Sequence, residues 1–211
     1  MTVAAAVLAA GRGSRLGGDA SKPLLEWRGR PLVQWALDAA LQSALAPVLL
    51  VVSYRADHVR AVLSRPSRSS PSYVAVNSEM LAGVGVEVVE NLEWEEGIAS
   101  SLRAALTALD PRPEVDAVCV GLADQPLVSP EAYRRVAATD GELVIPTYAG
   151  QPGNPVKLAR SLWSEALELH GDVGARALAR DRAVRIDCTG TGSAADVDTL
   201  EDLERLQQED Q

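Results

Sequence analysis

A glycine-rich segment directly after the first apolar run is the clearest place in the sequence for phosphate chemistry. The segment reads Leu8-Ala9-Ala10-Gly11-Arg12-Gly13-Ser14-Arg15-Leu16-Gly17-Gly18, and Lys22 follows. Glycines in a turn leave backbone N–H groups open to phosphate oxygens, and Arg15 and Lys22 add the positive charge that a triphosphate requires. The spacing G-x-G-x-x-x-G differs from the dinucleotide fingerprint, and the Gly-Lys-Ser/Thr of a P-loop is absent. A tight turn without a ligand is the alternative for this segment taken alone.

A carboxylate follows a second buried run. Asp124 comes directly after the apolar segment 116–122, which places it at the carboxyl end of a strand, where open α/β sheets bind ligands. A carboxylate repels a triphosphate unless a cation lies between them, and Mg²⁺ is commonly held by one or two carboxylates together with phosphate oxygens. Asp124 is therefore a candidate Mg²⁺ ligand, and a turn-forming aspartate is the alternative.

The elements that must position these residues alternate along the chain. Apolar runs predict strands at 2–9, 48–53, 84–89, 116–122, 143–146 and 184–187. Apolar residues at helical spacing predict helices at 31–44, 56–63, 100–109, 131–138, 158–169, 174–180 and 199–208. This alternation predicts an α/β fold with a doubly wound, mostly parallel sheet in a single Rossmann-like domain spanning 1–211. The Pro/Ser/Arg-rich segment 64–83 is expected to be a loop or an insertion.

Composition narrows the class of protein. The chain has 211 residues, no phenylalanine and a formal net charge of -9. A core of Ala, Val and Leu suits a buried parallel sheet, and the acidic balance argues against nucleic acid as a partner. The two cysteines form no CxxC pair, and the apolar N-terminus lacks the basic start of a signal peptide and is too short to span a membrane. We therefore expect a cytoplasmic protein with no membrane partner.

Three further motifs complete an ordered set. They are Asn91 with Gly97-Ile98-Ala99-Ser100-Ser101, Gly150-Gln151-Pro152-Gly153-Asn154-Pro155 with His170-Gly171-Asp172, and Ala195-Asp196-Val197-Asp198-Thr199. With all five motifs in this order, the chain resembles the MobA-like nucleotidyltransferases, and specifically their molybdenum cofactor cytidylyltransferase (MocA-type) branch. The resemblance implies a nucleotide-diphospho-sugar transferase-like fold, Mg²⁺ as cofactor, and transfer of a nucleoside monophosphate from an NTP to a phosphorylated acceptor with release of pyrophosphate.

The resemblance also implies roles for single residues. Arg15, Lys22 and Asp124 would be catalytic, and Asp124 and Asp198 would bind the metal, with Asp196 the less favoured second ligand. Asn154 and Asp172 would face the acceptor. The residues implied in nucleotide binding are Leu8, Ala9, Ala10, Gly11, Gly13, Arg15, Lys22, Asn91, Ser100 and Ser101.

The nucleotide and the acceptor stay open. The resemblance pairs Leu-Ala-Ala-Gly, here at 8–11, with CTP and Leu-Ala-Gly-Gly with GTP. The first hypothesis is CMP transfer to the molybdopterin cofactor, with transient contact to a molybdenum enzyme that receives the product. The second is a transferase of the same fold that uses another NTP or another phosphorylated acceptor, and the third is a non-catalytic nucleotide-binding or chaperone-like module for a molybdenum enzyme.

Overall fold

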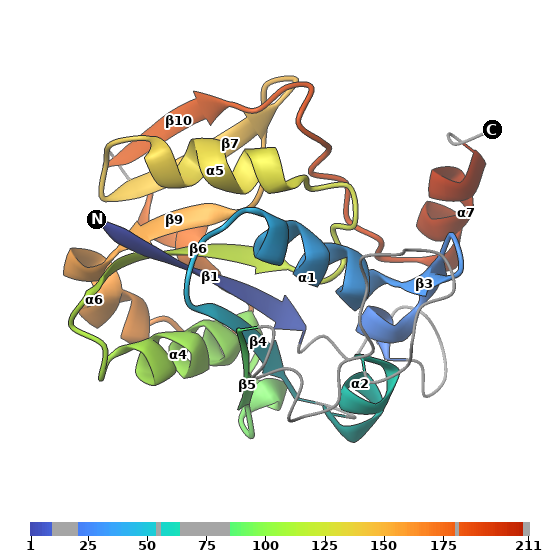
Figure 1. Cartoon of the computed structure of the whole chain (residues 1–211), viewed down its shortest axis with the longest axis horizontal. Helices are drawn as coiled ribbons and strands as arrows, with labels where there is room; N and C mark the ends of the chain where they lie inside the picture. The colour runs from blue at the N-terminus through green and yellow to red at the C-terminus, as the bar shows by residue number, and fades with distance from the viewer. Residues whose placement is uncertain (10–20, 54–55, 64–84, 180–181, 209–211) are drawn as a thin grey trace.

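The computed structural model describes residues 1–9, 21–53, 56–63, 85–179 and 182–208. Its centre is an eight-stranded sheet in the order β10-β7-β9-β6-β1-β4-β5, with β8 paired to β7 (Figure 1). The strands are β1 (Thr2–Ala9), β4 (Val48–Val52), β5 (Val86–Glu90), β6 (Val115–Leu122), β7 (Leu143–Tyr148), β8 (Gln151–Pro152), β9 (Val156–Ala159) and β10 (Ala183–Asp187). Pairs β1–β4, β1–β6, β4–β5 and β7–β10 are parallel, which confirms the mostly parallel α/β fold.

Helices cover both faces of this sheet. The α-helices are α1 (Leu32–Gln42), α2 (Ala56–Leu63), α4 (Ile98–Leu109), α5 (Pro130–Ala138), α6 (Trp163–Leu167) and α7 (Leu200–Gln208). Apolar side chains of α1, α2 and α5 share one buried cluster with the sheet, and those of α4 and α6 share the other. The doubly wound arrangement predicted from the alternation is therefore confirmed.

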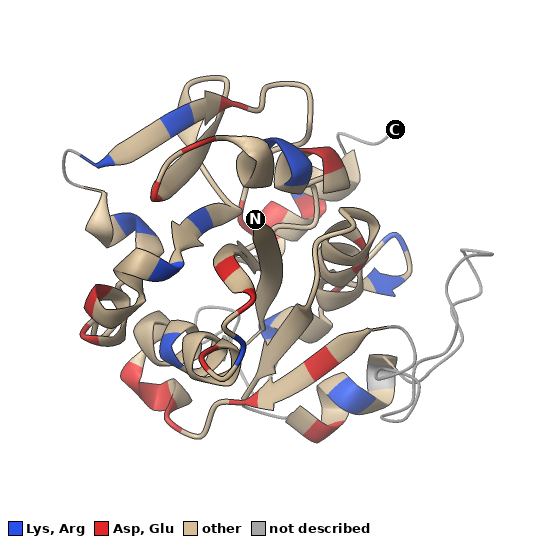
Figure 2. Ribbon diagram, turned by 60° about the vertical axis from the view of Figure 1, so that its left-hand side comes forward, with Lys and Arg blue, Asp and Glu red and all other residues tan. Residues whose placement is uncertain are grey.

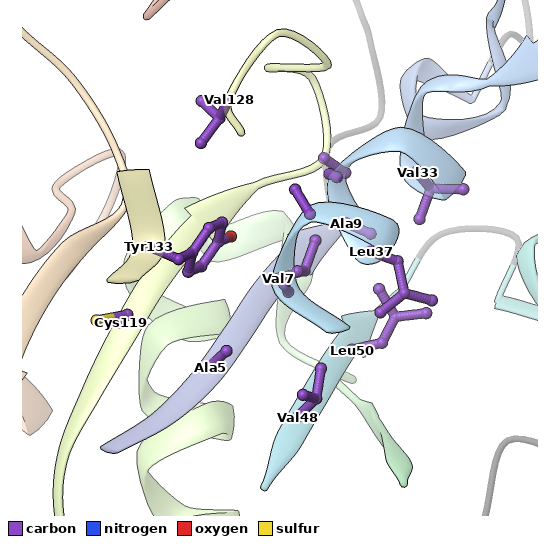
Figure 3. Close-up of a cluster of buried hydrophobic side chains, with 14 of the residues drawn as sticks. Ala5, Val7, Ala9, Val33, Leu37, Val48, Leu50, Cys119, Val128 and Tyr133 are labelled. Atoms are coloured by element: carbon purple, nitrogen blue, oxygen red, sulfur yellow. The ribbon is translucent and has the colours of Figure 1, made fainter. Parts of the chain in front are cut away.

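Alternation of side chains along the central strand builds both clusters. Val3, Ala5 and Val7 of β1 point into the first cluster, and Ala4 and Ala6 point into the second, as the period of two in a strand requires. This strand carries no charge, while charged residues are interspersed over the described helices and loops (Figure 2). Figure 3 shows the first cluster, in which strand side chains such as Val7, Leu50 and Cys119 pack together with Leu37 of α1 and Tyr133 of α5.

Two predicted helices are corrected by the structure. The segment 158–169 begins as strand β9, which lies between β6 and β7 and is antiparallel to both, and then forms the short 3₁₀ helix η4 (Arg160–Leu162) and α6. Pairing on two sides outweighs the helical spacing of the apolar residues. The predicted helix 174–180 is only the 3₁₀ helix η5 (Ala175–Leu178) within the described residues. The segment 64–83 lies outside the described residues.

A small unit lies beside the carboxyl edge of the sheet. The 3₁₀ helix η2 (Lys22–Leu24) leads into a hairpin of β2 (Glu26–Trp27) and β3 (Arg30–Pro31). Trp27 of this hairpin is buried with Leu32, Val197 and Leu206, so that the C-terminal helix α7 packs against the hairpin (Figure 1). This contact fixes the segment that precedes α7 next to the strand ends.

Candidate functional site

Three of the predicted site residues meet at the carboxyl edge of the sheet. Asp124 follows β6, Lys22 begins η2, and Asp198 lies just before α7. The Lys22 Nζ donates to Asp124 Oδ2 and to Asp198 Oδ1, at 2.5 Å from each oxygen. The site therefore contains one ammonium group held between two carboxylates that are far apart in the sequence.

The lysine is held inside this group. Lys22 is 9% exposed. Burial alone lowers its pKa, but the charges and hydrogen bonds of Asp124 and Asp198 raise the pKa above its ordinary value. The ammonium is therefore charged at neutral pH, and it offsets part of the repulsion between the two carboxylates.

The segment that carries Asp198 is anchored on both sides. The Val197 N–H donates to the Asp124 carbonyl at 3.0 Å, and the Val197 side chain is fully buried in the cluster around Trp27. Thr199 and Asp202 then start α7 as a capping pair: the Thr199 hydroxyl donates to Asp202 Oδ2 at 2.8 Å, and the Asp202 N–H donates back to Thr199 Oγ1 at 3.1 Å. Asp198 is thereby directed at the site from a fixed backbone.

Asp124 has the capacity to hold a metal ion. Its Oδ1 atom is buried and has no hydrogen-bond partner in the part of the chain that the structure describes. A buried oxygen without a partner costs free energy, and a divalent cation would remove that cost. Within the described residues, no cluster of three or more His, Cys, Asp or Glu side chains could hold a metal ion. Mg²⁺ is commonly held by one or two carboxylates with phosphate oxygens completing its coordination, and Asp124 and Asp198 would supply two such carboxylates.

Sequence reasoning gave no role to the residue after Asp124. Gln125 is 2% exposed, and its Nε2 donates to the Ala194 carbonyl at 3.0 Å and to Asp196 Oδ1 at 2.5 Å. Desolvation, followed by the nearby Asp124 charge, raises the pKa of Asp196. Asp196 thus lies beside the site but is turned toward Gln125. The only signal in the sequence was the position of Gln125 next to Asp124.

The nucleotide-side residues form a buried polar cluster. The Asn91 Nδ2 donates to Ser100 Oγ at 2.8 Å and to Ser101 Oγ at 3.0 Å, and Asn91 Oδ1 accepts from the Glu93 N–H at 2.9 Å. All of Asn91, Ser100 and Ser101 are less than 5% exposed. The cluster therefore ties the end of β5 to the first turn of α4, and Asn91 is engaged within the protein at both ends of its amide.

A cavity of about 350 Å³ opens on the other side of α4. It is lined largely by aliphatic side chains, together with Asn154, Asp172 and Arg176. Asn154 is 6% exposed, and its Nδ2 donates to Gln125 Oε1 at 3.0 Å. The structure therefore places both predicted acceptor residues in one cavity, which Asn154 connects to the residue beside Asp124.

The start of α4 and the cavity wall fit closely. Gly97 has φ of 109°, and a Cβ there would lie 2.5 Å from the Gly171 carbonyl carbon and 2.7 Å from Asp172 Oδ1. The Ala99 N–H donates to the Gly171 carbonyl at 3.1 Å, and the exposed His170 pairs through Nδ1 with Glu96 Oε1 at 2.7 Å. Glycine at position 97 is thus required for the contact that places Asp172 at the cavity.

The rest of the predicted nucleotide segment is only partly described. Leu8 and Ala9 end β1 and are buried, and Leu8 also lines the cavity. Ala10, Gly11, Gly13 and Arg15 lie outside the described residues. Within the described residues, no helix is long and apolar enough to cross a membrane.

The chain has a mostly parallel α/β sheet, a glycine-rich segment after its first strand, and carboxylates at the carboxyl edge of the sheet. These features are typical of nucleotide-binding α/β domains. The chain belongs to the family of the MobA-like NTP transferase domain, whose model matches residues 5–186. The family predicted from the five motifs is thereby confirmed.

Particular relatives extend over almost the whole chain. The nicotine blue oxidoreductase of Paenarthrobacter nicotinovorans is 31% identical over 208 residues, which cover 97% of this chain and 96% of that protein. The crystal structure of Rv0371c from Mycobacterium tuberculosis H37Rv is similar with a TM-score of 0.74 at 31% identity, over 98% of this chain and 97% of that chain. A structure of Rv0371c in complex with manganese has a TM-score of 0.71 at 28% identity, over 99% of both chains.

Proposed function

We propose that this chain is a cytoplasmic, Mg²⁺-dependent cytidylyltransferase that transfers CMP from CTP to a phosphorylated acceptor, with the molybdopterin cofactor as the leading acceptor. The observation that carries the proposal is the Lys22 ammonium, held 2.5 Å from both Asp124 and Asp198. A charged lysine beside two carboxylates suits a site that receives a triphosphate together with a divalent cation. The manganese complex of Rv0371c supports a divalent cation in a chain of this fold.

The proposed reaction needs no protein nucleophile. An oxygen of the acceptor phosphate attacks the α-phosphorus of CTP, the bond from that phosphorus to the bridging oxygen breaks, and pyrophosphate leaves with the bonding electron pair. Mg²⁺ held by Asp124 and Asp198 would supply charge neutralisation at the phosphate oxygens. Lys22 and Arg15 would bind the departing phosphates, so that the protein contributes alignment and positive charge.

The choice of CTP rests on the segment 8–11. This sequence has alanine at position 10, and an alanine is bulkier and has less backbone freedom than a glycine, so we expect it to favour a pyrimidine over a purine. One methyl group discriminates by only about 1–3 kcal/mol, so further contacts are needed. Asn91, Ser100 and Ser101, which are hydrogen-bonded to one another, are the candidates for these further contacts.

The cavity beside α4 is the proposed acceptor site. Its wall is mainly aliphatic, with side chains such as Leu102, Val120 and Val156, and Asn154, Asp172 and Arg176 add three polar side chains. A sugar ring would leave several hydroxyl groups facing aliphatic side chains, which is costly for unpaired polar groups. A fused ring system can place its faces against the aliphatic wall while Asn154, Asp172 and Arg176 meet its polar edge groups, and this supports a pterin over a sugar phosphate.

The test is pyrophosphate release with each of the four NTPs, Mg²⁺ and a phosphorylated acceptor. We expect the highest kcat/KM with CTP, and we expect Asp124→Asn to lower it by about 100-fold or more. Asp116→Asn is the matched control, because Asp116 lies on the same strand β6 at the opposite edge of the sheet. If the Asp124 variant keeps near-normal activity, the assignment of Asp124 as a metal ligand is wrong. If GTP or ATP gives a higher kcat/KM than CTP, the cytidylyl assignment is wrong, and a nucleotidyltransferase that uses another NTP remains.

The Paenarthrobacter relative provides a second candidate. Its printed name is nicotine blue oxidoreductase, so oxidoreductase activity on nicotine blue is the second candidate for this chain. Oxidation of NADH or NADPH in the presence of nicotine blue, measured in parallel with the pyrophosphate assay, separates the two activities. A chain that binds CTP but shows neither activity would be the non-catalytic module.

A further inference from the structure

The buried amide of Gln125 connects the two halves of the candidate site. Its Oε1 accepts from Asn154 Nδ2 at 3.0 Å, while its Nε2 donates to the Ala194 carbonyl and to Asp196 Oδ1. Asn154 lines the cavity, and 194–198 is the segment that ends at Asp198. One side chain therefore links the cavity wall to the segment that bears a proposed metal ligand.

The chemistry of the partners sets the orientation of this amide. The Ala194 carbonyl oxygen can only accept a hydrogen bond, so the Gln125 NH₂ group must face it, and the same NH₂ group lies 2.5 Å from Asp196 Oδ1. The opposite orientation would bring the Gln125 carbonyl oxygen against two other oxygens. Asn154 stabilises the correct orientation because its own NH₂ group occupies the other end of the Gln125 amide.

The backbone segments on either side of Gln125 are packed closely against each other. A Cβ at Gly153 would lie 2.6 Å from the Ala194 Cβ, so the backbone before Asn154 and the segment 194–198 are in close contact. The Val197 N–H to Asp124 carbonyl bond then fixes the same segment to the end of β6. From this position Asp198 Oδ1 accepts a hydrogen bond from the Lys22 Nζ at 2.5 Å.

We propose that Gln125 is a positioning residue that holds Asp198 opposite Asp124, and that Asn154 acts through Gln125 by setting the direction of its amide. The inference rests on the proposed function, because it assigns the two carboxylates to a divalent cation. It adds that the cavity and the metal ligands are coupled through one buried amide. Hydrogen bonds to a carboxylate are among the stronger ones in proteins, which makes Gln125 the main link in this coupling.

Three variants test the orientation of the amide. Gln125→Met keeps the length of the side chain but removes all of its hydrogen bonds. Asn154→Ala removes the donor to Gln125, whereas Asn154→Asp replaces it with an acceptor, so that Gln125 must rotate and present its carbonyl oxygen to Asp196. We therefore expect Asn154→Asp to cause a larger effect than Asn154→Ala, and as large an effect as Gln125→Met.

Two measurements read the result without any turnover. Amide hydrogen exchange of the segment 194–199 should become about tenfold faster in Gln125→Met, and the Mn²⁺ dissociation constant, measured by titration, should rise about tenfold. Leu109→Ala is the control for general destabilisation, because Leu109 is fully buried in α4 and is neither a residue of the cavity wall nor one of the residues around Gln125, Asp124 and Asp198. This control should lower Tm and leave both readouts at the wild-type value.

Each outcome decides a separate question. If the Gln125 and Asn154 variants lower Tm but keep wild-type exchange at 194–199 and wild-type Mn²⁺ affinity, Gln125 only packs and the proposal is overturned. Equal effects of Asn154→Ala and Asn154→Asp would refute the orientation argument. If the wild-type protein binds no Mn²⁺, the metal part of the proposed function fails, and hydrogen exchange still shows whether Gln125 holds the segment.

Discussion

Replacing Lys22 with methionine should strengthen metal binding while it slows catalysis. Asp124 Oδ2 and Asp198 Oδ1 each lie 2.5 Å from the Lys22 Nζ, so the two oxygens are at most twice that distance apart. Two like charges at about 5 Å repel by about 3 kcal/mol at an effective dielectric constant of about 20. The Asp198 side chain is 43% exposed, and solvent screening reduces the repulsion to about 1–2 kcal/mol.

In Lys22→Met, a bound divalent cation would relieve the repulsion between Asp124 and Asp198, and it would not have to displace an ammonium group. The Mn²⁺ dissociation constant of Lys22→Met should therefore fall by about 5- to 30-fold, since about 1.4 kcal/mol corresponds to a factor of ten. The kcat/KM for CTP should fall by about 100-fold, because a positive charge on the phosphates is lost. Calorimetric titration with Mn²⁺ in the absence of nucleotide measures the first change, and pyrophosphate release measures the second.

The chain's other lysine is the control. Lys157 is 1% exposed, and its Nζ donates to the Ala137 and Thr139 carbonyls at the end of α5. Lys157→Met should therefore lower Tm but leave the Mn²⁺ affinity unchanged. An unchanged or weaker Mn²⁺ affinity in Lys22→Met would refute the view that this lysine and the cation share one place.

Three further outcomes follow from the described contacts. Gly97→Ala should raise KM for the acceptor more than KM for CTP. The new Cβ would lie 2.5 Å from the Gly171 carbonyl carbon and would therefore shift the cavity wall. Equal changes in the two KM values would contradict this. Thr199→Ala should lower the free energy of unfolding by about 1 kcal/mol at neutral pH in urea denaturation. The hydrogen bond from the Thr199 hydroxyl to Asp202 Oδ2 is the largest cause that lowers the pKa of Asp202, so only this bond's share of the difference depends on pH. That share is present above the ordinary pKa of an aspartate and is lost as pH falls through the lower, folded-state pKa, whereas the bond from the Asp202 N–H to Thr199 Oγ1 remains. Cys119 and Cys188 are fully buried, and burial raises the pKa of the Cys119 thiol to about 12; a thiol reagent should react with both only after unfolding in guanidinium, and rapid reaction of the native protein would contradict their burial.

The sequence alone determined the parallel strands of the central sheet. Runs such as 3–9 and 48–52 are apolar without interruption and buried at every residue, and such burial is typical of a strand that is covered on both faces. Once these strands are parallel, a residue that follows one of them must lie at the carboxyl edge, so the location of Asp124 followed from local pattern. The family followed in the same way, because its motifs occur in order along the chain.

The tertiary structure decided which side chains meet. Lys22 and Asp198 are 176 positions apart, and no periodicity in the sequence relates them. The contact depends on the packing of Val197 against Trp27 and on the Val197 N–H to Asp124 carbonyl bond. A motif shows that a carboxylate is available, whereas only the packing of α7 on the hairpin shows what that carboxylate faces.

The same reason explains the missed strand and the missed glutamine. Residues 156–159 form β9 because β6 and β7 offer backbone partners on both sides. The sequence of the segment itself does not predict that these two strands will lie beside it. Gln125 reads as an ordinary turn residue until Asn154, Ala194 and Asp196 surround it. Local sequence encodes how much of a side chain is to be buried, but the partner of a buried polar group is set by the segments that the fold brings around it.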